Sequence, residues 1–97
     1  MSETQAVSVR VLDREYTVGV GSGEVDGLMS AARLLDTRMR EVRGANRMAA
    51  IDRVAVLAAL NLAHELEQLR AEGERRDREM ATLLAALQAR LDTLLDA

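Results

Sequence analysis

Two short motifs contain residue types that could do chemistry. Residues 64–68 read His-Glu-Leu-Glu-Gln, which begins like the zinc motif H-E-x-x-H but has Gln68 where the second histidine is required. Residues 19–24 read Gly-Val-Gly-Ser-Gly-Glu, and Glu24 stands where a dinucleotide-binding G-x-G-x-x-G loop needs its third glycine. We therefore interpret His64 as a partly buried helix residue near the edge of an apolar stretch, and the glycines as loop and cap residues.

The composition excludes several further classes of site. The chain has one histidine and no cysteine, so a metal centre is not expected. All 13 basic residues are arginine, which removes lysine nucleophiles and the phosphate-binding lysine of a P-loop. We predict a protein that is not an enzyme and that has no cofactor.

The charge distribution points to a protein partner. Residues 33–53 hold six arginines and three acids, although the whole chain carries a net charge of −3. The arginine-rich window is either a solvated helix face or a binding surface. Arginine makes bidentate contacts with carboxylates, and no aromatic residues lie between the arginines for bases to stack on, so an acidic protein is favoured over nucleic acid.

The chain also lacks the sequence patterns of membrane and exported proteins. No apolar run approaches the ~20 residues of a membrane span, and the first residues have no signal-peptide layout. The sequence therefore predicts a cytoplasmic protein without membrane insertion.

The elements that must position these residues begin with a β-hairpin. Apolar and polar residues alternate in two runs within residues 7–20. If residues 13–14 form the turn, Val11 lies opposite Tyr16 and every large apolar side chain except Leu12 falls on one face. A lone two-stranded hairpin is marginal in water, so we expect a helix or another chain to cover that face.

A first helix follows the hairpin. Ser22 is a plausible N-cap, apolar residues then recur at spacings of three and four from Val25 to Val42, and Gly44 suits a C-cap. The hairpin and this helix make up a predicted head at residues 1–47.

Residues 48–97 are predicted to form one long helix, because from residue 49 onward they contain no proline and only one glycine. Residues 51–66 are apolar almost all round, residues 70–79 are highly charged, and residues 80–95 are amphipathic. The apolar residues along one side of this helix, which we call the seam, recur at heptad-like steps of four and three residues. An offset of 11 residues between Leu69 and Met80 interrupts these steps. The seam residues and their apolar neighbours are the expected oligomerisation residues: Val54, Leu57, Asn61, Leu62, Leu66, Leu69, Met80, Leu84, Leu87, Leu91 and Leu94.

This helix is too long for a head of 47 residues to cover, so its apolar stripe must contact other chains. Asn61 is open to two interpretations: a solvent-facing residue, or a buried residue that fixes the register between chains. The predicted fold class is α+β, with a small hairpin-plus-helix head followed by a long C-terminal helix in an oligomeric antiparallel coiled coil.

Three segments resemble the ZapA family of bacterial cell-division proteins. They read VSVRVLDREY at residues 7–16, SAARLLD at 30–36 and DRVAVLAALNLAHEL at 52–66. The glycine-rich loop after the second strand departs from the family, whose members often have proline there, and His64 stands where many members have an aromatic residue.

The resemblance implies a specific function. Family members dimerise, form antiparallel tetramers through their helices, and cross-link protofilaments of the tubulin-like protein FtsZ in the division ring at mid-cell. Charged head residues bind FtsZ, and the matching positions here are Arg14, Arg43, Arg47 and Asp52. The alternative is a generic coiled-coil adaptor whose long helix pairs with a different helical protein.

Overall fold

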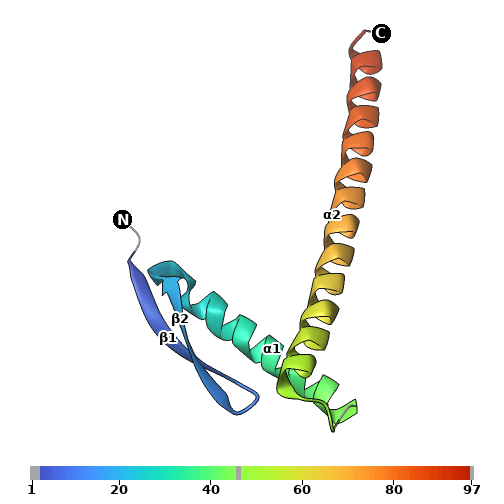
Figure 1. The fold of residues 1–97 in the computed structure, drawn as a ribbon. Coiled ribbons are helices and arrows are strands. Elements are labelled where there is room, and N and C mark those ends of the chain that lie inside the picture. The colour runs from blue at the N-terminus through green and yellow to red at the C-terminus, as the bar shows by residue number, and fades with distance from the viewer. Residues whose placement is uncertain (1–2, 46, 97) are drawn as a thin grey trace. The chain divides into compact units, whose positions relative to one another are not determined.

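The computed structural model describes residues 3–45 and 47–96, and Figure 1 shows its elements. They follow the order β1 (Thr4–Val11), β2 (Arg14–Gly21), the 3-10 turn η1 (Ser22–Glu24), α1 (Val25–Ala45) and α2 (Ile51–Leu95). The predicted hairpin, first helix and long C-terminal helix are confirmed. The chain divides into two compact units, residues 1–61 and 62–97, so the first turns of α2 belong to the same unit as the hairpin and α1.

The hairpin turn lies one residue earlier than the sequence pattern suggested. Val11 pairs with Arg14 and Val9 pairs with Tyr16, so the turn consists of Leu12 and Asp13. Both turn residues have positive φ angles, 49° and 64°, as a type I′ turn requires. The predicted pairing of Val11 with Tyr16 is therefore wrong by two positions on β2.

The predicted faces of the hairpin are nevertheless correct. Side chains alternate with a period of two, so a slip of two positions keeps every residue on its face. Val9 and Val11 are buried against the rest of the unit, whereas Arg10 and its cross-strand partner Glu15 are exposed on the other face.

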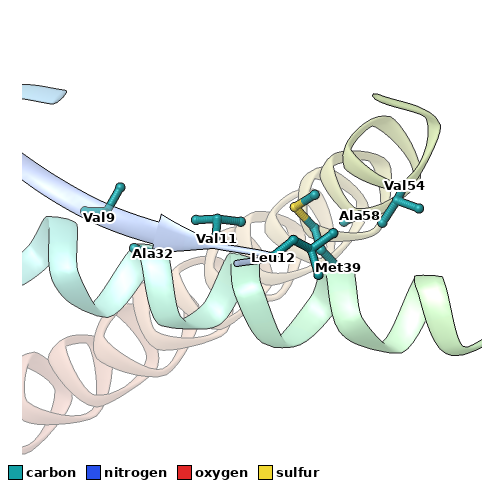
Figure 2. Close-up of a cluster of buried hydrophobic side chains, with 7 residues drawn as sticks. All are labelled: Val9, Val11, Leu12, Ala32, Met39, Val54 and Ala58. Atoms are coloured by element: carbon teal, nitrogen blue, oxygen red, sulfur yellow. The ribbon is translucent and has the colours of Figure 1, made fainter. Parts of the chain in front are cut away.

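The buried core of the first unit joins β1, the hairpin turn, α1 and the beginning of α2 (Figure 2). Its members are Val9, Val11, Leu12, Ala32, Met39, Val54 and Ala58. Leu12, which the sequence pattern placed off the apolar face, is only 6% exposed. Its position in the turn directs its side chain into the core beside α1. Val54 and Ala58 anchor the beginning of α2 in the same core, because these two α2 residues are almost fully buried.

Helix α1 differs from its predicted ends by small shifts. Ser22 does not cap α1: it opens η1, and its N–H donates to the carbonyl oxygen of Glu3 at 3.0 Å. Val25 begins the α-helix, and Gly44 lies within it because the helix continues to Ala45. The hydrogen bond to Glu3 ties the entry of the helix to the beginning of β1.

Helix α2 is continuous over 45 residues, which corresponds to a length of about 68 Å at 1.5 Å per residue. Its charged middle contains ion pairs between Arg70 and Glu67 at 3.4 Å and between Arg75 and Glu79 at 4.0 Å. Such pairs stabilise an exposed helix modestly. Over the described residues, no helix has the length and apolar character needed to cross a membrane.

Candidate protein-interaction surfaces

Three side chains tie the hairpin turn to α1. The N–H of Leu12 donates to Asp36 Oδ1 at 2.8 Å, and Arg40 Nε donates to Asp36 Oδ2 at 2.9 Å. Arg40 Nη2 also donates to Asp13 Oδ1 at 3.0 Å. We call Asp13, Asp36 and Arg40 the tip clamp, because together they attach both turn residues to the helix.

The local geometry of α1 explains how the clamp forms. Asp36 and Arg40 are four residues apart, so they lie on the same helix face one turn from each other. The hydrogen bond from Arg40, followed by the one from the N–H of Leu12, lowers the pKa of Asp36 below its ordinary value of 3.8. The two carboxylates raise the pKa of Arg40, with Asp36 contributing most. The Asp36 carboxylate and the Arg40 guanidinium are therefore both charged at neutral pH.

The four residues expected to bind a partner are all exposed. Arg14 is the first residue of β2 and directly follows the turn, whereas Arg43 lies in the last turn of α1. Arg47 lies in the connection between the helices, and Asp52 lies in the first turn of α2. The Oδ1 atom of Asp52 accepts a hydrogen bond from the N–H of Arg53 at 3.0 Å.

The tip clamp places Arg14 at the same end of the unit as the C-terminal part of α1. Asp13, the residue before Arg14, contacts Arg40, which lies three residues before Arg43. The charge of Arg43 also contributes to the lowered pKa of Asp36. The fold thus brings the hairpin turn, next to Arg14, and the C-terminal part of α1, with Arg43, into one charged region.

Sequence reasoning did not single out Asp36 and Arg40 as functional. Their acid-before-base spacing of four residues was a usable signal for an ion pair on the helix. No local pattern indicated that the same pair would bind a turn 24 residues away in sequence.

The second surface is an apolar stripe along α2. In one chain Leu69 is 63% exposed, Leu87 is 51% exposed and Leu94 is 71% exposed. The remaining expected seam residues of the C-terminal half are also exposed: Leu66, Met80, Leu84 and Leu91. Exposed apolar side chains in two such runs, one on each side of the charged residues 70–79, are typical of an interface with another chain.

The expected oligomerisation residues nearer the head have different environments. Leu57 and Leu62 are half-buried, and Asn61 is exposed in a single chain. Val54 is 1% exposed because it packs in the core of its own chain, which leaves it almost no surface to offer a second copy.

The head also has an apolar groove of about 410 Å³ between the hairpin and α1. Its lining includes Val11, Val18, Leu28 and Leu35, the larger side chains of Tyr16 and Met39, and Ala55 of α2. The chain has no Phe and no Trp whose rings would fill such a space.

The possible chemical motifs have no companion groups in the structure. His64 lies on α2 as predicted, but it is exposed and not partly buried. The described part of the chain contains no cluster of three or more His, Cys, Asp or Glu residues that could hold a metal ion. Gly19 and Gly21 belong to β2, and Ser22 and Gly23 belong to η1.

Comparisons with known proteins found named relatives of this chain. A relative named cell division protein ZapA from Pseudomonas aeruginosa is 39% identical over 92 residues, covering 95% of this chain and 86% of that protein. A relative of the same name from a Geobacillus species is 32% identical, covering 77% of this chain and 87% of that protein.

Two solved structures have a similar fold. One is described as an unknown conserved bacterial protein from Pseudomonas aeruginosa, with a TM-score of 0.64 and 38% identity, covering 95% of this chain and 98% of that chain. The other is a mutant ZapA dimer from Geobacillus stearothermophilus, with a TM-score of 0.66 and 25% identity, covering 82% of this chain and 92% of that chain. The family model described as cell division protein ZapA matches residues 7–95. The chain therefore belongs to the ZapA family of cell division proteins.

Proposed function

We propose that this protein is a non-enzymatic scaffold that binds FtsZ protofilaments and cross-links them in the division ring. The observation that carries this proposal is the uncovered apolar stripe on a 45-residue helix that begins in a charged head. Helix and head supply the two functions that a cross-linker needs, self-association and filament binding. We assign self-association to residues 48–97 and filament binding to the head at residues 1–47, in a protein that acts in the cytoplasm at mid-cell.

The stripe supports assembly into dimers and antiparallel tetramers. Apolar side chains that remain about half exposed in one chain gain stability when a second helix covers them. The seam residues are Leu57, Asn61, Leu62, Leu66, Leu69, Met80, Leu84, Leu87, Leu91 and Leu94. The similar structure from Geobacillus stearothermophilus is a dimer, which supports at least the first step of this assembly.

The charged region of the head supports binding to an acidic filament surface. Arg14, Arg43 and Arg47 are exposed cations, and Asp52 adds a carboxylate that discriminates among partner charges. Each exposed contact is weak and is screened by salt. A tetramer carries several heads on one rod, so binding of one head raises the effective concentration of the others near the filament.

Co-sedimentation with FtsZ polymers tests the proposal. At low ionic strength we expect the protein to enter the polymer pellet and to bundle the filaments, and at high ionic strength we expect both effects to decline. The protein centrifuged without FtsZ is the control for self-aggregation. If the pellet is not enriched at low ionic strength, FtsZ is not the partner, and a stable oligomer would then favour the adaptor that pairs with another helical protein.

A further inference from the structure

The hairpin turn is held in a conformation that its residues do not prefer. Leu12 and Asp13 have φ angles of 49° and 64°, and a bulky residue such as leucine rarely adopts a positive φ. Backbone conformations of this kind persist where the surrounding structure fixes them. Here the N–H of Leu12 is bound by Asp36, and the carboxylate of Asp13 is bound by Arg40.

The apolar pattern by itself does not select this turn. A hairpin with its turn at residues 13–14 would pair Val11 with Tyr16 and would keep every apolar residue on the same face, since it differs by a slip of two positions. In that alternative Arg14 would be a turn residue. In the structure Arg14 is instead the first residue of β2 and pairs with Val11.

The burial of Leu12 also favours the observed turn. Its side chain is 6% exposed and belongs to the head core, and its N–H bond to Asp36 measures 2.8 Å. The side chain of Asp36 is 26% exposed and that of Arg40 is 43% exposed. The hydrogen bonds that Asp36 accepts from the N–H of Leu12 and from Arg40 are therefore partly shielded from water. The clamp and the core therefore act together on the same residue.

We propose that Asp36 and Arg40 are positioning residues that select the register of the hairpin and thereby set the direction in which Arg14 faces the filament. This inference rests on the proposed function, in which Arg14 contacts FtsZ. Arg40 acts through the turn: its guanidinium is engaged by two carboxylates, Asp36 at 2.9 Å and Asp13 at 3.0 Å. Its positive charge is largely neutralised before a partner arrives.

The main test compares Arg40→Gln with Arg33→Gln, a change of the same charge on the same helix outside the clamp. We expect Arg40→Gln to weaken FtsZ co-sedimentation about fivefold, the upper end of what a partly exposed ion pair contributes. Arg33→Gln should change it less than about twofold. Oligomer mass and helical circular dichroism should be unchanged in both variants.

A double-mutant cycle separates positioning from direct contact. If Arg40 acts through Arg14, the variant carrying both Arg14→Ala and Arg40→Gln should bind no more weakly than Arg14→Ala alone. If Arg40 itself contacts the filament, the two losses should add. Additive losses would overturn the positioning role.

A register measurement supplies a readout independent of binding. In the wild-type chain, nuclear Overhauser contacts should connect the backbones of Val9 and Tyr16, as the observed pairing requires. In Arg40→Gln and Asp36→Ala, contacts between Val9 and Val18 should appear, and the amide of Leu12 should exchange faster with solvent. An unchanged register together with unchanged exchange would overturn the inference.

The possible outcomes distinguish this inference from the proposed function. If wild-type protein does not pellet with FtsZ, both fail. If Arg14→Ala loses binding while Arg40→Gln does not, only the positioning role fails. Should Arg40→Gln unfold, Arg40→Lys retains the charge but lacks the planar fork that reaches both carboxylates, and full binding by this variant would also contradict the inference.

Discussion

Leu87→Glu is the sharpest test of the apolar stripe. Leu87 lies in the amphipathic part of α2, residues 80–95, and is 51% exposed in one chain, so about half of its side chain remains for a partner to cover. Covering that half contributes about 1 kcal/mol, given about 1.5–3 kcal/mol for burying a whole leucine side chain. A glutamate at the same position adds the cost of placing a charge among leucines.

Symmetry multiplies the effect. In the proposed tetramer each of the four chains contributes one Leu87, so the lost burial alone amounts to about 4 kcal/mol, or about a thousandfold in the tetramer association constant. The charge can only increase this figure. We therefore expect Leu87→Glu to sediment as a smaller species at concentrations where the wild-type protein is fully assembled.

Sedimentation equilibrium over a concentration series measures this shift. Ala89→Glu is the matched control, because it adds the same charge two residues away at the heptad position opposite the proposed seam, where the side chain is exposed. Its mass should equal that of the wild-type protein. The seam assignment is refuted if Leu87→Glu keeps the wild-type mass, or if Ala89→Glu dissociates to the same extent.

Three further predictions concern the head. Arg47→Glu should leave the oligomer mass unchanged and reduce FtsZ bundling at low ionic strength, since Arg47 is exposed in the helix connection; normal bundling would remove Arg47 from the binding surface. Val54→Ala should lower the free energy of unfolding by about 2 kcal/mol in urea denaturation, because it opens a cavity at a side chain that is 1% exposed; a loss below about 0.5 kcal/mol would contradict tight packing there. Because the pKa of Asp36 is lowered, the clamp contributes stability at pH values above 3.8, the ordinary pKa of the group. This stability is lost as the pH falls through the still lower pKa of the folded state. Acidification through this range should therefore lower the protection factor of the Leu12 amide, which compares its exchange with that of an unstructured amide at the same pH. Asp36→Asn should remove that part of the pH dependence, and equal profiles would show that Asp36 is not the titrating group.

The candidate binding residues illustrate how sequence and structure divide the problem. The resemblance predicted four separate binding positions, Arg14, Arg43, Arg47 and Asp52. All four are exposed, as residues that bind a partner must be. The grouping of Arg14 with Arg43 depends on the contact between Asp13 and Arg40, which joins residues 27 apart in sequence. No periodicity of a strand or helix encodes a contact at that separation.

The sequence by itself determined the elements and their faces. Alternation of period two defined the buried side of the hairpin, and spacings of three and four residues defined α1 and the stripe on α2. These signals are local, because each side chain's direction follows from its own backbone geometry. They also predicted that the stripe exceeds what a small head can cover.

Only the tertiary structure decided the turn, the use of Val54 and the clamp. Two registers of the hairpin satisfy the same alternation, and the one observed is held by Asp36 binding the N–H of Leu12. Val54 belongs to a run that is apolar on nearly every side, so its periodicity did not show whether its own head or another chain would bury it. Such choices depend on which distant groups meet, and that is fixed only when the elements pack together.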